Sequence, residues 1–119
     1  MVAPNVVSVT SILGKTDVQS VGTSATAITT CPTDKVYKIN SLVVANIDGV
    51  NAADITVDLF RSSVAYRIAS TITVPADTTL VVISKDMGVY LEEGDAIRCT
   101  ASAAGDLQAT CSYEIISEV

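Results

Sequence analysis

Histidine and tryptophan are absent from this chain of 119 residues, and phenylalanine occurs only once. Without histidine, the chain lacks the usual general base of serine and cysteine nucleophile triads. It also lacks the side chain that most often ligates transition metals. No nucleophile motif and no glycine-rich phosphate loop is present in its place. We therefore expect a protein that is not an enzyme and uses no cofactor.

Positive charge is also scarce. Seven Lys and Arg residues are scattered singly against 13 Asp and Glu residues, which gives a net charge of −6. Because phosphate binding needs clustered basic side chains, neither nucleic acid nor an anionic membrane is an expected partner. No stretch approaches the roughly 20 apolar residues of a membrane span. The first residues also lack the charged and long apolar regions of a signal peptide.

Cysteine occurs three times, at Cys31, Cys99 and Cys111, without a Cys-x-x-Cys pair. An odd count does not indicate a secreted disulfide framework, and the spacing gives little support to a zinc site. We expect free, buried thiols in a protein made in a reducing cytoplasm. The alternative is a disulfide between Cys99 and Cys111, which flank the last predicted turn and share one alternation phase.

Apolar residues make up 49% of the chain, and β-branched Val and Thr recur throughout. Such residues favour strands over helices. About eight predicted strands are separated by turns every 8 to 12 residues, which is typical of a sandwich or barrel. We predict an all-β, single-domain antiparallel β-sandwich, jelly-roll-like, over residues 14–119. Residues 1–13 form an extended N-terminal arm or an edge strand.

The central prediction is a hairpin over residues 35–62, with two long strands around a polar turn. Its apolar phase slips near Asn40-Ser41, so we expect a β-bulge or bend there. Before it, the sequence predicts a turn at residues 14–17 and an edge strand over residues 18–30, interrupted at Gly22. After it, strands are predicted at residues 64–74, 79–84, 89–91, 96–101 and 107–116. Residues 79–84 are apolar on both faces, as in a strand that is covered on both sides.

Two acidic clusters have a functional and a structural interpretation. Asp48, Asn51 and Asp54 surround a turn and offer oxygen atoms to calcium, but their spacing matches no calcium loop. Asn and Asp also belong in turns for conformational reasons, so a plain turn is favoured. Adjacent carboxylates at Glu92, Glu93 and Asp95 suit glycosidic cleavage. With no aromatic platform nearby, a solvated rim is the preferred interpretation.

Four tyrosines are spaced about one per strand, at Tyr37, Tyr66, Tyr90 and Tyr113. Several rings on one face would form a sugar-binding platform, which makes a carbohydrate-binding module a second functional hypothesis. Packing at sheet edges or interfaces is the more usual role of tyrosines at this spacing.

The N-terminal arm is unusually apolar for a chain terminus, which indicates a contact with a neighbouring subunit. The candidate partner-contact residues are Val2, Val6, Val7, Val9 and Ile12.

Three motifs carry a family resemblance: Val44-Ala45-Asn46 before a polar turn, the corner from Val74 to Val82, and the turn LEEGD at residues 91–95 before a closing strand at residues 112–117. With them, the chain resembles small virion structural proteins of tailed bacteriophages, especially those of marine and cyanobacterial hosts. The resemblance covers roughly residues 36–117 and implies a β-sandwich that binds other virion proteins.

The resemblance implies a capsid decoration (cement) protein that is located in the virion, is assembled in the host cytoplasm and is often trimeric. Its expected partners are the major capsid protein and further copies of itself. A tail, collar or fibre-associated subunit is the alternative within the same family setting.

Overall fold

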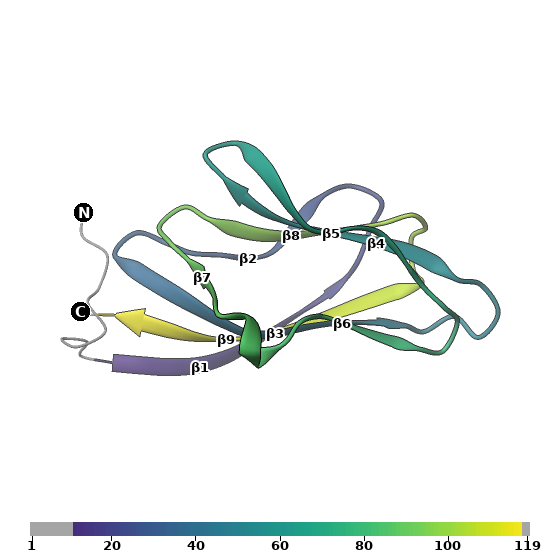
Figure 1. The fold of residues 1–119 in the computed structure, drawn as a ribbon, viewed down its shortest axis with the longest axis horizontal. Coiled ribbons are helices and arrows are strands. Elements are labelled where there is room, and N and C mark those ends of the chain that lie inside the picture. The colour runs from purple at the N-terminus through teal and green to yellow at the C-terminus, as the bar shows by residue number, and fades with distance from the viewer. Residues whose placement is uncertain (1–10, 118–119) are drawn as a thin grey trace.

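Two antiparallel sheets face each other across a core of aliphatic side chains in the computed structural model, which describes residues 11–117 (Figure 1). No α-helix occurs in this range, and a single 3-10 turn, η2, spans Lys85–Met87. The strands are β1 (Ser11–Ser20), β2 (Thr26–Thr30), β3 (Lys35–Asn46), β4 (Ala53–Arg61), β5 (Val64–Val74), β6 (Thr79–Ile83), β7 (Val89–Leu91), β8 (Ala96–Ala101) and β9 (Leu107–Ser117).

The strand order is that of a jelly roll. One sheet runs β1-β9-β3-β6, with β7 also paired to β3, and the other runs β2-β8-β4-β5. The chain doubles back between β4 and β5, so that β4 pairs with β5, β3 with β6 and β7, β2 with β8, and β1 with β9. This nested hairpin is rolled up until β9 also lies beside β3, and β8 beside β4. The predicted all-β, jelly-roll-like sandwich is therefore confirmed.

The predicted hairpin over residues 35–62 is wrong in its pairing, although both of its strands form. β3 and β4 lie in different sheets, and the polar link between them crosses from one sheet to the other. β4 instead pairs with β5 through the turn at Ser62 and Ser63, whose φ angles of 52° and 62° are those of a tight hairpin turn. Periodicity shows where a strand lies but not which strand lies beside it.

The predicted bulge is confirmed. Ile39 lies opposite Tyr113 and Ser41 opposite Ser112, so Asn40 is the extra residue in β3. Because the bulge shifts the alternation by one residue, Ile39 and Leu42 both point into the core.

The start of the chain differs from the prediction. The expected turn at residues 14–17 lies inside β1, which pairs with β9 over ten consecutive residues. Gly14 sits there in an open environment, where an added Cβ would meet no atom within 4 Å, and it does not break the strand. The interruption at Gly22 is confirmed, since it separates β1 from β2. Residues 11–13 thus belong to an edge strand, and residues 1–10 of the predicted arm lie outside the described residues.

Strand β6 is not covered on both faces, as its apolar sequence had suggested. It lies at the margin of its sheet, and the Val81 side chain is 57% exposed. The 3-10 turn after β6 separates it from β7, as the two predicted strands at residues 79–84 and 89–91 require. Nine strands occur within residues 11–117 where about eight were expected, because the predicted strand over residues 18–30 is divided between β1 and β2.

Candidate functional site

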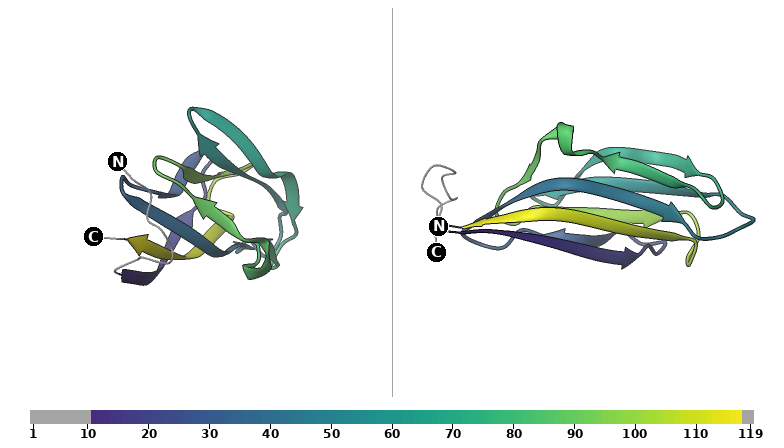
Figure 2. Two further views of the ribbon diagram at one scale, coloured as in Figure 1. Left: turned by 60° about the vertical axis from the view of Figure 1, so that its left-hand side comes forward. Right: turned by 90° about the horizontal axis from the view of Figure 1, so that it is seen from below.

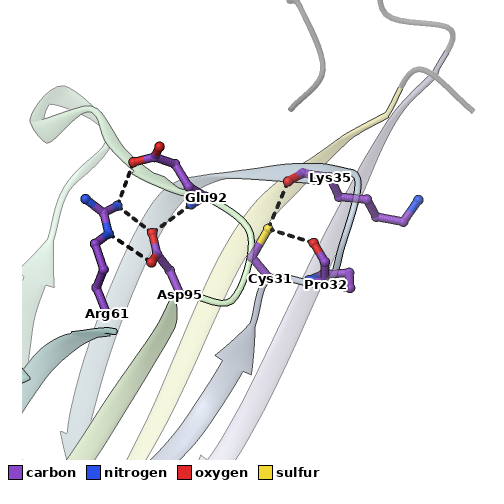
Figure 3. A network of polar contacts seen from close by, with 6 residues as sticks. All are labelled: Cys31, Pro32, Lys35, Arg61, Glu92 and Asp95. Carbon is purple, nitrogen blue, oxygen red and sulfur yellow. Dashed lines mark hydrogen bonds and ion pairs between the residues drawn. The ribbon is translucent and has the colours of Figure 1, made fainter. Parts of the chain in front are cut away.

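The acidic turn between β7 and β8 is tied to the end of β4 by an ion-pair network (Figure 3). Arg61 donates from Nε to Oδ1 of Asp95 at 2.9 Å, and its Nη2 contacts both Oδ2 of Asp95 and the Glu92 carboxylate, the latter at 2.8 Å. The backbone N–H of Glu92 donates to Oδ2 of Asp95 at 2.8 Å. Beside this network lies a groove of about 530 Å³, lined by Phe60, Arg61, Ser62, Ser63, Glu92, Glu93, Gly94 and Asp95.

Asp95 has the environment of a structural carboxylate. Burial acts to raise the pKa of Asp95, but the hydrogen bonds from Arg61 and from the Glu92 N–H outweigh burial and lower it. A general acid for glycosidic cleavage needs a raised pKa, which is the opposite direction. The solvated-rim prediction is also wrong for Asp95, whose side chain is buried, whereas Glu92 is exposed. Sequence reasoning missed Arg61 because nothing local connects the end of β4 with the turn before β8.

The turn around Asp48 and Asn51 is hydrogen-bonded within itself, in agreement with the favoured interpretation as a plain turn. Oδ1 of Asp48 accepts the N–H groups of Val50 at 2.7 Å and of Asn51 at 3.0 Å, and these bonds lower the pKa of Asp48. Asp54 lies on β4, where its Oδ1 accepts a hydrogen bond from Thr73 on β5. Within residues 11–117, no group of three His, Cys, Asp or Glu side chains is placed to hold a metal ion.

Asn46 holds this turn against the rest of the sandwich. Its buried amide donates from Nδ2 to the carbonyls of Asn51 at 3.0 Å and of Val74 at 2.9 Å. Its Oδ1 accepts the Asp48 N–H at 2.9 Å. The link between the two sheets is therefore fixed by one side chain at the end of β3.

All three cysteines are free and buried, as predicted. Cys99 on β8 and Cys111 on β9 do not face each other across a hairpin, because their strands belong to different sheets. Burial raises the pKa of both thiols to about 12 and that of Cys31 to about 11. At neutral pH these thiols are protonated and therefore unreactive.

The four tyrosines do not form a shared platform. Tyr37 and Tyr113 are buried and stack on each other, with ring centroids 4.7 Å apart. The hydroxyl of Tyr113 donates to Oδ2 of Asp17 at 2.7 Å. Tyr66 on β5 and Tyr90 on β7 are exposed, but they lie on different sheets. Within residues 11–117, the tyrosines therefore do not form a surface of several rings on which a sugar could stack.

The outer face of the β2-β8-β4-β5 sheet carries charged pairs. Asp58 on β4 lies opposite Arg98 on β8 and Arg67 on β5. Arg98 donates to Asp58 from Nε at 2.9 Å and from Nη2 at 3.3 Å, and it lies 3.9 Å above the Phe60 ring. These contacts leave only 2% of Asp58 exposed. The charges of Asp58 and Arg98 are thus paired within the chain.

The outer face of the β1-β9-β3-β6 sheet has a central area without any charged side chain, which we call the uncharged face. Its middle row runs across the four strands through Val18, Thr110, Val43 and Val81. The rows on either side complete the face with Thr16, Ser112 and Ser41, and with Ser20, Gln108, Ala45 and Thr79. Val18 is 75% exposed, the most of any side chain in this row of valines. The centre of this sheet surface therefore consists of aliphatic and uncharged polar side chains.

The predicted contact residues fall mainly outside the described range. Val2, Val6, Val7 and Val9 belong to residues 1–10, whereas Ile12 lies on β1 opposite Ile116 and is exposed. Sequence analysis placed the contact surface in this arm and missed the uncharged face. The Ser, Thr and Val residues of the uncharged face alternate along each strand in the sequence. The strands that carry these residues are far apart in the chain, so the face they form together was not recognised.

Comparisons with known proteins identify the fold and no family. No protein-family model and no curated protein matches the sequence. Among solved structures, the chain is similar to a protein of Bacillus endospore appendages, which are described as a family of disulfide-linked pili. The two share 13% identity over 91% of this chain and 89% of the other, with a TM-score of 0.54. No helix within residues 11–117 has the length and apolar character needed to cross a bilayer.

Proposed function

We propose that this protein is a non-enzymatic structural subunit of a tailed-bacteriophage virion, specifically a capsid decoration (cement) protein that binds and stabilises neighbouring capsid proteins. The observation that carries the proposal is the uncharged face. Depletion of charge distinguishes the core of a protein interface from ordinary surface. On a chain with a net charge of −6, eleven neighbouring outward positions without a charge are typical of a surface that another protein covers.

The polar clusters support a structural role. Asp95, Asp48 and Asp58 each accept at least two hydrogen bonds from the chain itself, so these three carboxylates maintain loops and strands. A protein whose activity is to bind neighbours needs a rigid scaffold and a surface of suitable chemistry, and it needs no reactive group. Virion assembly in the host cytoplasm also suits three buried, reduced thiols.

The uncharged face is too small to form a stable interface without further contacts. Four strands at about 4.8 Å spacing and five residues at about 3.3 Å each span roughly 300 Å². A stable interface needs roughly 800 Å² per partner, so this face alone gives a weak contact. The predicted contact residues Val2, Val6, Val7, Val9 and Ile12 would extend it. Multiple copies on a capsid lattice would add avidity.

Capsid binding is tested with particles that lack the protein. Purified wild-type chain is mixed with such particles and co-sedimented, beside Val43→Lys on the uncharged face and Val50→Lys in the β3–β4 link, where the valine is 85% exposed. We expect Val43→Lys to lose at least roughly tenfold in occupancy, since it buries an unpaired charge at the interface. Val50→Lys should bind like wild type. Equal binding by all three would exclude the uncharged face as the contact.

The position in the particle is tested by electron microscopy of virions with a labelled subunit. Label on the capsid surface supports the proposal, whereas label on the tail, collar or fibres supports the alternative virion role. Label on neither would overturn both. Deleting residues 1–10 leaves β1 complete, and it should lower occupancy while the sandwich still folds. The homotrimer that the resemblance implies is tested by the mass of the free protein.

A further inference from the structure

The sandwich has four sheet edges, and they differ in how readily another strand could pair with them. β2 has five residues and a register shift, and Nε2 of Gln19 caps its carbonyls at Ala27 (3.1 Å) and Thr26 (3.4 Å). β5 has two register shifts against β4 and a residue at positive φ, Thr71 (55°). The margin formed by β6 and β7 is divided by η2. Short, bulged, capped or broken strands of this kind resist pairing with another chain.

β1 has none of these features. It contains ten residues, pairs with β9 in ten consecutive positions without a register shift, and contains no proline. It forms the end of its sheet, and no strand within residues 11–117 lies along its other margin (Figure 2, right). Most of its side chains are exposed. A long, regular and open margin is a template for an additional strand.

We propose that β1 pairs in antiparallel fashion with β1 of a second copy of this chain, about a two-fold axis that passes through Thr16. This pairing follows from the open edge of β1 and its side chains, and it does not depend on the proposed virion role. A second copy of β1 is the partner strand that matches the register, the charges and the side-chain volumes of this edge.

Charge selects the register. In an antiparallel pair, directly opposite residues point to the same face, so the two-fold axis must pass through a residue and not between two. An axis at Lys15 would place Lys15 opposite itself, and an axis at Asp17 would place Asp17 opposite itself. An axis at Thr16 places Lys15 of each copy opposite Asp17 of the other. Two ion pairs then replace the long 3.9 Å contact between Lys15 and Asp17 within one strand.

Side-chain volume agrees with this register. The axis at Thr16 places Val18 of each copy opposite Gly14 of the other. Val18 is the highly exposed member of the uncharged face, and Gly14 leaves open space where a side chain would stand. Thr16 faces its own counterpart, which is a favourable cross-strand pair. A glycine inside a regular strand is typical of a site where another chain approaches closely.

The pairing has a consequence for the uncharged face. Two four-strand runs, each in the order β1-β9-β3-β6, become one continuous eight-stranded sheet. The two uncharged faces then lie side by side on the same side of that sheet and form a surface of twice the area. A dimer would therefore bring this surface closer to the size of a standard interface.

Disulfide trapping tests the register in the full chain. Thr16→Cys places a thiol on the axis, next to its own copy, whereas Ser20→Cys lies opposite Ile12 and roughly 26 Å from its counterpart. Because a disulfide requires Cα atoms within about 7 Å, mild oxidation should link Thr16→Cys into dimers and leave Ser20→Cys monomeric. The native thiols are buried and protonated, so they do not compete. Equal linking of the two variants, or no linking of Thr16→Cys, would overturn the register.

Sedimentation equilibrium tests the dimer without a new thiol. The wild-type chain should show a concentration-dependent species of twice 12.3 kDa. Lys15→Glu should weaken association at least roughly tenfold, because it sets two carboxylates opposite each other, and Lys15→Arg should preserve it. A monomer at every concentration, or a trimer unaffected by Lys15→Glu, contradicts the proposal. Val43→Lys should leave the dimer intact, so a failure of the capsid proposal and a failure of this one are distinguishable.

Discussion

The two outer faces of the sandwich differ in how charged side chains are distributed over them. Both sheets direct alternate side chains into a shared core, which leaves the remaining positions free to differ. On the β2-β8-β4-β5 sheet these positions carry Asp58, Arg98 and Arg67, and Asp58 and Arg98 are paired so closely that the aspartate is buried. On the β1-β9-β3-β6 sheet the central positions carry Val, Ser and Thr. The first face thus pairs Asp58 with Arg98 inside the chain, whereas the centre of the second face carries no charge at all.

Of the substitutions that distinguish the two faces, Asp58→Ala should have the largest effect on the unfolding free energy. Removing the carboxylate leaves the partly buried Arg98 guanidinium without its counter-ion, which we expect to cost about 3 kcal/mol of unfolding free energy. The measurement is chemical denaturation. Thr110→Ala, at a central position of the uncharged face, is the matched control and should change stability by less than about 0.5 kcal/mol. If the two variants were equally stable, the charged pair would not distinguish the faces.

Asp95→Asn should have the next largest effect, about 2 kcal/mol, because the amide keeps the shape but loses the charge-assisted bonds from Arg61. The pH dependence has a definite sign. Since the folded pKa of Asp95 lies below its unfolded value, its stabilisation is present above the unfolded pKa and is lost as pH falls through the folded pKa. Denaturation between neutral pH and pH 3 should therefore show a smaller loss for Asp95→Asn than for wild type. Parallel curves for the two proteins would contradict this assignment.

The smallest expected effect on stability comes from Val81→Lys on the uncharged face. Its side chain is already half exposed, so the unfolding free energy should change by less than about 0.5 kcal/mol. Binding to capsid particles should nevertheless fall, as we expect for Val43→Lys, because the new charge is buried on assembly. Thermal denaturation measures the stability of the variant, and co-sedimentation measures its binding to the particles. Early unfolding of the variant would contradict the expected stability, and normal binding would show that this face is not the contact surface.

Much of the fold was predictable from local pattern. Alternation located β5, β7 and β8 to the residue, and a one-residue slip located the bulge at Asn40. The pattern failed at Gly14, where a glycine and charged neighbours indicated a turn inside what is a regular edge strand. It failed again for β3 and β4, because a polar link between two strands is compatible with a hairpin and with a crossing between sheets.

The candidate sites were less predictable, since each depends on residues that are distant in sequence. Asp48 and its turn were interpreted correctly, because the hydrogen bonds that shape the turn come from within three residues. Asp95 was misplaced at the surface, because the residue that neutralises it, Arg61, lies 34 positions earlier. The uncharged face was missed for the same reason: its central row joins residues of four different strands.

By itself, the sequence determined the all-β fold class. β-branched residues that alternate with period two favour strands, and the chain has no long window with helical period. Only the tertiary structure decided which strands are neighbours, and hence where charge is paired and where it is absent. The physical reason is that alternation assigns each side chain to a face of its own strand, whereas the composition of a sheet surface depends on pairings between segments that the local pattern does not specify.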